Sequence, residues 1–203
     1  MRYKRAVEKL RLLAEACERI ADWPPDFDPW LLGMYAFGPV LEGADPLEFV
    51  QVVGVIRVPP EDATWGSTPH GSEWAADWLR LSKGGFEYWW RSHQDPVWNH
   101  YIREPVRIWS QEGIEEEALD ALEERRFGDL KRLASEPAGQ RLQLRDEKDA
   151  ALRHLREVHG SYWDQQWRRD HRGMGRYPEN ELWEAVEGYL DILDASHSSS
   201  SLR

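Results

Sequence analysis

The sequence predicts a protein of the α+β or α/β class, in which helices flank a small mixed sheet of about three or more strands and a helical bundle follows. Three observations predict this class. Residues 2–21 repeat apolar side chains at helical spacing. Residues 47–56 form a nearly continuous run rich in β-branched side chains. After residue 113 the apolar spacing is helical throughout.

The first helix is expected over residues 2–21. Its apolar side chains recur every three or four residues with Arg, Lys and Glu between them, so one face of the helix is apolar. Cys17, the single cysteine, lies on this face, which favours a buried thiol over a nucleophile and excludes an internal disulfide. Pro24 and Pro25 are expected to end the helix, because the residue before a proline disfavours helical backbone.

Two strands are expected next. Residues 31–37 form a short apolar run between prolines. Residues 47–56 do not alternate between apolar and polar side chains, which predicts a central strand covered on both faces. Pro59 and Pro60 stop this second strand, because proline lacks the backbone N–H that a sheet requires.

The middle of the chain alternates between loop-forming segments and apolar segments. Ser72 is a predicted N-cap for a helix over residues 73–82, after a loop over residues 57–71 rich in Pro, Gly, Ser and Thr. Residues 86–93 are strongly aromatic and are expected to be helical or irregular. Residues 105–110 alternate between apolar and polar side chains, which predicts a third strand.

The remaining apolar pattern predicts three helices. They cover residues 114–126, a long stretch over 139–170 with a bend at Gly160, and a last helix that Pro178 opens. Trp163 is expected to point inward. The predicted organisation is an α/β domain over residues 1–112, a helical bundle over 113–194 and a disordered serine-rich tail over 195–203.

The composition disfavours several classes of function. The chain has 203 residues and a formal net charge of −11, which disfavours broad binding to nucleic acid or to an anionic membrane because phosphates would be repelled. No stretch approaches the ~18 apolar residues of a spanning helix, and the charged start does not read as a secretory signal. We therefore expect a cytoplasmic protein, with a basic protein or a small anionic ligand as its partner. The oligomeric state stays open.

Residues 34–56 resemble the minimal nucleotidyltransferase superfamily. In that superfamily a strand ends in Phe-Gly-Ser, a short turn and helix follow, and the second strand opens with Asp-x-Asp. Phe37-Gly38 matches the strand end, and Gly43 matches the turn. Two carboxylates two residues apart on a strand point the same way and can hold Mg²⁺ ions against a phosphoryl group.

The sequence departs from this pattern at the positions on which the metal-dependent chemistry relies. Pro39 replaces the serine, Glu48 stands at the first carboxylate and Val50 at the second. Residues 105–110, the expected third strand, hold no acid. The resemblance therefore implies a catalytically degenerate protein with Gly38 and Glu48 at its ligand site. A Mg-nucleotide is a possible ligand that would not be turned over, and no other cofactor is identified.

Over nearly its whole length the chain also resembles a family of uncharacterised actinobacterial proteins. The stretches that carry this resemblance are residues 83–92, 95–100 and 175–179. It implies no activity.

Two clusters could contact a ligand. Residues 88–103 combine aromatic walls with convergent polar groups, as small-molecule sites do, and their candidate ligand residues are Trp90, Arg91, Asn99, His100 and Arg103. The alternative is that the tryptophans pack between the sheet and the helices.

Residues 163–176 hold a basic cluster with the candidates Arg168, Arg169 and Arg172. The alternative is a helix end with favourable cations, in which Asp164 pairs with Arg168. A shared cleft with Arg91 would select anionic ligands.

The seven histidines do not predict a metal site. His154 and His159 are five residues apart and do not share a helix face, and no cysteine or HExxH motif accompanies them. No metal ligand is therefore expected.

Three functions follow from these observations. The first is a degenerate nucleotidyltransferase-like binding or regulatory module for a nucleotide or other anionic ligand. The second is an antitoxin-like or immunity-like module that binds a basic protein through the acidic face Glu115–Glu117, Asp120, Glu123 and Glu124. The third is an enzyme that uses residues 88–103, with His100 as general acid or base. No intact catalytic motif favours the third function.

Overall fold

The computed structural model describes residues 1–21, 30–173 and 176–200. At its centre is a mixed sheet in the order β3-β2-β1-β4-β5. The five strands are β1 (Leu31–Phe37), β2 (Val50–Ile56), β3 (Phe86–Ser92), β4 (Val106–Ser110) and β5 (Gly113–Ile114).

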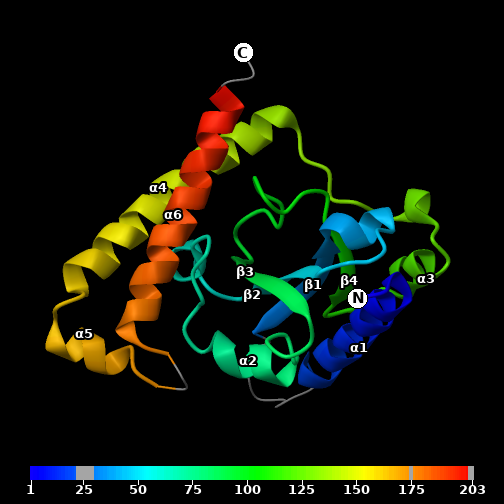
Figure 1. The fold of residues 1–203 in the computed structure, drawn as a ribbon, viewed down its shortest axis with the longest axis horizontal. Coiled ribbons are helices and arrows are strands. Elements are labelled where there is room, and N and C mark those ends of the chain that lie inside the picture. Colours follow the sequence, from blue (N-terminus) through cyan, green and yellow to red (C-terminus); the bar gives the residue numbers. More distant parts are fainter. Residues whose placement is uncertain (22–29, 174–175, 201–203) are drawn as a thin grey trace.

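Helices cover both faces of this sheet (Figure 1). On one side lie α1 (Tyr3–Ala21) and α3 (Glu116–Glu123). On the other side stand α4 (Pro137–Ser161) and α6 (Pro178–Ser200), which pack against each other. The predicted mixed sheet with flanking helices and packed C-terminal helices is confirmed, while the division at residue 112 stays a prediction.

The first helix forms as its apolar spacing predicts. In α1 the side chains from Tyr3 to Cys17 on the predicted face are buried, and Ile20 is partly buried. Pro24 and Pro25 lie outside the described residues. Burial raises the pKa of the Cys17 thiol far above its usual value, as expected for an inert core residue.

The two predicted early strands pair with each other in antiparallel register, and Phe37 at the end of β1 lies opposite Gln51 near the start of β2. Val50 and Val52 pack toward α1, whereas Val53 packs toward α4 and α6. β2 is therefore covered on both faces, as predicted. Its first residue is Val50, so Glu48 lies in the preceding segment rather than on the strand.

The segment after β2 corrects three predictions. A 3₁₀ turn, η2 (Pro60–Ala63), interrupts the expected loop, and the helix α2 spans only Ser72–Trp78. Gly71 occupies the N-cap position, and Ser72 is buried inside the helix without a capping bond. Residues 86–92 form the strand β3, parallel to β2, rather than a helix or an irregular segment. Aromatic side chains favour strands, and the α2 crossover returns the chain to the sheet in parallel.

The third predicted strand is confirmed as β4, which pairs with β1 and with the two-residue β5. Two further 3₁₀ turns are η1 (Gly38–Glu42), directly after β1, and η3 (Phe127–Asp129), after α3.

The C-terminal helices differ from the prediction at three points. α4 runs through Gly160 to Ser161, and the separate helix α5 (Gln165–Asp170) follows it. Trp163, expected to point inward, is 81% exposed in the connection between them. α6 continues to Ser200, into the predicted tail, and residues 201–203 lie outside the described part. The Ser196 hydroxyl donates to the Ile192 carbonyl four residues earlier, so it does not interrupt the helix.

The backbone of α6 approaches the segment that follows β2 closely. A Cβ at Gly188 would lie 2.1 Å from the Trp65 carbonyl oxygen, so only glycine permits this approach. Phe37, Val53, Trp65, Ile102, Leu144, Ala151 and Ile192 form one buried cluster between the sheet and these helices. Within the described residues no helix is long and apolar enough to cross a bilayer.

Candidate functional site

A groove lies at the end of β1, on the side of the sheet that α4 covers. Its cavity volume is about 620 Å³. We call it the Gly38 groove. Its walls come from the β1–β2 ends, from the β3–β4 loop and from the segment that leads into α4: Phe37, Gly38, Glu42, Gln51, Tyr101, Arg103, Glu104, Arg132, Ala134, Ser135 and Gln140.

Gly38 lets the chain turn sharply at the edge of this groove. Its φ of +71° lies in the left-handed region, which glycine adopts at little cost. A Cβ on Gly38 would also come within 1.9 Å of the Gln51 side-chain oxygen. The turn into η1 and the approach of Gln51 therefore both depend on glycine.

A hydrogen-bonded set forms the wall of the groove nearest β2. Gln51 Nε2 donates to Glu87 Oε2 at 2.9 Å and to the Tyr101 hydroxyl at 3.0 Å. Glu87 lies beside Gln51 in the parallel β2–β3 register. Burial, together with the nearby Glu87 charge, raises the pKa of Tyr101, so the phenol is neutral at physiological pH. The residue Tyr101 is 38% exposed, and its ring also packs against Phe37, Trp65 and Trp89.

Two guanidinium groups reach the groove from different segments. Arg132 donates to the Leu41 carbonyl at 2.9 Å and lies 3.5 Å from Glu104. Arg103 is exposed, and its Nε donates to the His100 carbonyl at 3.3 Å. Glu104 adopts a φ of +46°, an unusual backbone conformation for a residue with a side chain. Such strain costs on the order of 1–3 kcal/mol and is concentrated at functional sites.

A second polar cluster, the Glu147 network, lies deeper between sheet and helices. Glu147 of α4 sits at its centre, and both of its oxygens are occupied. Oε1 lies 2.6 Å from Arg91 Nη2 and accepts from Gln143 at 3.0 Å. Oε2 accepts from Asn99 at 3.2 Å and lies 3.4 Å from His100 Nδ1.

His100 joins this network to α6. Its Nε2 lies 3.2 Å from Asp191 Oδ2, and the same carboxylate oxygen accepts from Trp65 Nε1 at 2.6 Å. The imidazole meets the Trp65 ring edge-on, with 5.0 Å between the ring centres. The network therefore ties β3 and its following loop to both C-terminal helices.

The charges in the network stabilise one another. Burial alone would raise the pKa of Glu147, but Arg91, His100 and Gln143 outweigh burial and hold it below its usual value. Burial alone would lower the pKa of His100, but Asp191 and Glu147 outweigh burial and raise it. The hydrogen bond from His100 lowers the pKa of Asp191. The arrangement favours a cationic His100 between two anionic carboxylates.

A small cavity of about 210 Å³ borders the network near η2, with Arg91, Asp95 and Glu147 in its wall. Burial raises the pKa of Asp95, against the influence of Arg91. Within residues 1–21, 30–173 and 176–200, no group of three or more His, Cys, Asp or Glu side chains is placed to hold a metal ion.

A family model described as Domain of unknown function (DUF7711) matches residues 1–198 of this chain. The chain belongs to the DUF7711 family. No curated protein and no solved structure matches it. The DUF7711 match thus covers nearly the whole chain and names no activity.

In the DUF7711 chain the candidates predicted over residues 88–103 separate into three places. Arg91, Asn99 and His100 meet around Glu147, whereas Arg103 lines the Gly38 groove. Trp90 belongs to the core on the α1 side, where its ring packs against Trp30 and Tyr88. Asn99 and His100 therefore do not share the groove wall with Arg103.

The predicted nucleotidyltransferase-like residues also separate. Gly38 borders the groove, but Glu48 is an exposed residue two positions before β2 and is not in the groove wall. The third strand of the DUF7711 chain does carry an acid, Glu87, because the strand next to β2 is residues 86–92 rather than 105–110.

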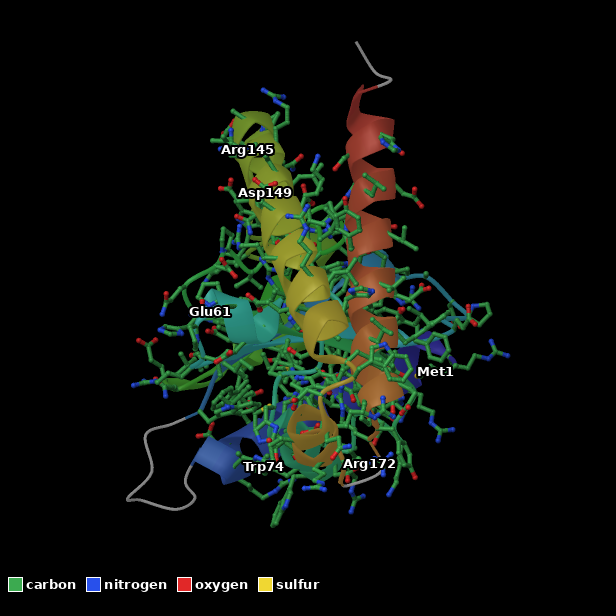
Figure 2. The ribbon with its side chains drawn as sticks, turned by 90° about the vertical axis from the view of Figure 1, so that its left-hand side faces the viewer. Met1, Glu61, Trp74, Arg145, Asp149 and Arg172 are labelled. Atoms are coloured by element: carbon green, nitrogen blue, oxygen red, sulfur yellow. The ribbon has the colours of Figure 1, made fainter. Side chains whose placement is uncertain are left out.

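The basic cluster after α4 is far from Arg91. Glu147, the partner of Arg91, precedes the end of α4 at Ser161 by about 21 Å of helix, and α5 follows that end. Figure 2 shows Arg172 at the end of the α4–α6 pair where α5 lies, and Arg145 at the other end of α4. The predicted shared cleft is therefore not formed.

Within this basic cluster the predicted ion pair is replaced by another. Asp164 caps α5 by accepting from Trp167 N at 2.7 Å, and Arg168 pairs with Glu179 at 2.8 Å instead. Arg169 and Arg172 are exposed. The cluster remains basic at the surface, but two of its four arginines, Arg168 and Arg176, pair with acids of α6.

The predicted acidic face on α3 is matched by bases of the same chain. Arg11 alone lies within 3.5 Å of a carboxylate oxygen of Glu116, Asp120 and Glu123. The remaining acids pair with Arg107, Lys131 and Arg126: Glu115 at 2.6 Å, Glu117 at 3.1 Å and Glu124 at 2.6 Å. These pairs reduce the net charge that α3 offers to a basic partner.

Sequence reasoning missed the residues that close the network and line the groove. Glu147 carried a readable signal, because it stands on the buried side of α4 between Leu144 and Ala151. An acid within an apolar stripe requires a buried partner. Gln51 carried no such sequence signal, since its role depends on a neighbour in β3.

Proposed function

We propose that the DUF7711 chain is a non-catalytic binding module that holds a nucleotide-sized anionic ligand in the Gly38 groove. The observation that carries this proposal is that Arg103, Arg132 and the partly exposed Tyr101 line one groove at the end of the β1–β2 pair. In this groove two candidate ligand residues from the sequence, Gly38 and Arg103, line a cavity together with one further cation, Arg132.

The size and chemistry of the groove suit such a ligand. Its volume of about 620 Å³ falls within the roughly 300–1,000 Å³ typical of small-molecule sites. Guanidinium groups bind phosphate oxygens through paired N–H donors. An aromatic ring such as that of Tyr101 offers a stacking surface for a base. We therefore place the phosphates near Arg103 and Arg132 and the base near Tyr101.

The same wall explains why we propose binding without turnover. In the nucleotidyltransferase-like reading, β1, the short helix η1 and β2 form the phosphate-binding unit, and acids on β2 and a later strand hold the metal ions. Here the β2 residue at the groove is Gln51, a neutral amide, and its neighbour Glu87 is a single carboxylate. The other acids of the groove wall, Glu42 and Glu104, lie outside this strand pair. In the described residues no group of three or more His, Cys, Asp or Glu side chains is placed to hold a metal ion, so a bound Mg-nucleotide would remain unreacted.

The other two predicted functions gain less support. A general acid–base role needs a reacting group within reach of His100, yet both of its ring nitrogens face carboxylates of the same chain. A basic protein partner would meet an α3 face whose acids already have basic neighbours. Both functions stay predictions.

Isothermal titration calorimetry with ATP, ADP and inorganic phosphate, each with and without Mg²⁺, tests the proposal. We expect saturable binding of the nucleotides, weaker binding of phosphate alone, and recovery of unchanged nucleotide by chromatography. Arg103→Ala should weaken nucleotide binding by about tenfold or more, because a charged hydrogen bond contributes about 1.5–3 kcal/mol. Since Arg103 is exposed, the variant should fold normally.

Arg169→Ala is the matched control, because it removes an exposed arginine of the α5 cluster, remote from the groove. It should leave nucleotide affinity unchanged. Absence of binding by any of the three ligands, or equal loss in both variants, would overturn the proposed site. Consumption of the nucleotide would overturn the proposed lack of turnover.

A further inference from the structure

The hairpin of α4 and α6 presents an apolar seam on the side away from the sheet. Trp183, Val186, Leu190 and Leu193 of α6 follow one another at spacings of three and four residues, so they share one helix face. Trp183 is 66% exposed and Leu190 is 46% exposed. In Figure 2 both helices stand side by side toward the viewer and the sheet lies behind them. Large exposed apolar residues in a row indicate a surface that another molecule covers.

Charges of opposite sign flank this seam. α4 carries five Lys or Arg and four Asp or Glu, a formal charge of +1. α6 carries six Asp or Glu and no Lys or Arg, a formal charge of −6. Arg145 and Arg156 share the exposed α4 face that contains Leu152, and Glu187 and Asp194 border the α6 seam. The hairpin therefore places a helix with a small excess of positive charge beside a strongly acidic one.

This pattern is complementary to itself. In a two-fold dimer the same patch of both copies forms the interface. A two-fold axis that runs parallel to the two helices, between the copies, lays α4 of one copy antiparallel over α6 of the other, and α6 over α4. The bases of each copy then meet the acids of its partner, while Trp183 and Leu190 enter the shared core.

The size of the face is close to that of a stable dimer interface. α4 has 25 residues and α6 has 23, so the helices are about 37 and 34 Å long. Two helices side by side are roughly 20 Å wide, which gives a face on the order of 700 Å². Stable interfaces bury about 800 Å² per partner.

We propose that this face binds a second copy of the chain, so that two α4–α6 hairpins form a four-helix bundle with α4 packed against α6 of the partner. Four-helix bundles bury such seams between antiparallel helices. The inference is independent of the Gly38 groove, and the substitution Arg103→Ala should leave self-association unchanged.

Sedimentation velocity of the full chain between about 1 and about 300 µM, at about 0.15 M salt, tests this inference. The wild-type chain should be a dimer over most of this range. Trp183→Glu should raise the dissociation constant by about 30-fold or more, as removal of a central aromatic anchor does. Trp163→Glu is the matched control, because Trp163 is 81% exposed and precedes α5 outside the seam. A monomeric wild-type chain, or equal effects of the two substitutions, would overturn the inference.

Charge reversal tests which helices meet. One variant carries Arg145→Glu and Arg156→Glu on α4, and a second carries Glu187→Lys and Asp194→Lys on α6. Each should associate with itself at least about tenfold more weakly, because like charges then face one another. An equimolar mixture should form a heterodimer, since the reversed α4 then faces the reversed α6. A mixture that associates no better than its components would exclude this packing. Circular dichroism should show unchanged helix content in every variant, because all the substituted residues are exposed.

Discussion

The Glu147 network and the Gly38 groove contain the same pairing of arginine with glutamate in opposite surroundings. Arg91 and Glu147 lie 2.6 Å apart with 2% and 8% of their side chains exposed. Arg132 and Glu104 lie 3.5 Å apart with 28% and 58% exposed. The buried pair is closed by further hydrogen bonds, whereas the exposed pair borders a cavity with room for a ligand.

This difference separates groups that hold the fold from groups that can bind. A buried ion pair loses its hydration and is tolerated only when every charge has partners in the protein. Glu147 meets that condition, and it thereby fastens α4 to β3 and to the following loop. Arg103 and Arg132 keep access to solvent, so a ligand can replace water around them at little cost.

The largest expected effect comes from opening the network. Glu147→Ala leaves Arg91 buried beside unpaired donors from Asn99 and Gln143, so we expect a loss of about 3–5 kcal/mol in the free energy of unfolding. Urea denaturation followed by tryptophan fluorescence measures it. Asp146→Ala, one residue earlier on the exposed side of α4, should change stability by less than about 0.5 kcal/mol. Similar losses in both variants would show that the network does not hold α4.

A smaller effect is expected at the groove. Gly38→Ala forces a side chain into the left-handed region, which should cost about 1–2 kcal/mol in the free energy of unfolding. The Gln51 side chain can rotate away, so the steric part is relieved. Gly128→Ala is the control, since its Cβ would meet nothing within 4 Å. Thermal unfolding of the two variants compares them, and a Gly38→Ala variant as stable as wild type would show that the turn relaxes.

The smallest expected effect is a dependence on pH. The pKa of His100 is raised in the fold, so protonated His100 contributes stability that is fully present below its unfolded pKa of about 6.5 and is lost as pH rises through the folded pKa. The stability difference between wild type and His100→Gln should therefore shrink from pH 6 to pH 8.5, by less than about 1.4 kcal/mol per pH unit. Equilibrium unfolding across this range measures it. A difference independent of pH would indicate a neutral imidazole.

Several elements could be predicted because their signal is local. The apolar stripe of α1, the β-branched residues of β2 and the alternation in β4 each specify one element without reference to the rest of the chain. β3 was missed because its side chains face aromatic neighbours on both sides, and its adjacent tryptophans Trp89 and Trp90 hide the alternation. The burial of Trp90 and the exposure of Trp163 likewise depended on packing rather than on hydrophobicity.

The amino-acid sequence by itself determined the helix α1 and the strands β1, β2 and β4, and it determined that β2 lacks the paired acids of a metal-dependent phosphate site. Only the tertiary structure decided which polar residues are buried with partners inside the protein and which remain accessible to a ligand. His100 meets Glu147 and Asp191 from 47 and 91 residues further along the chain. Periodicity reports the neighbours of a residue within one or two turns or strands, whereas the charge and solvation of a site depend on groups that only folding brings together.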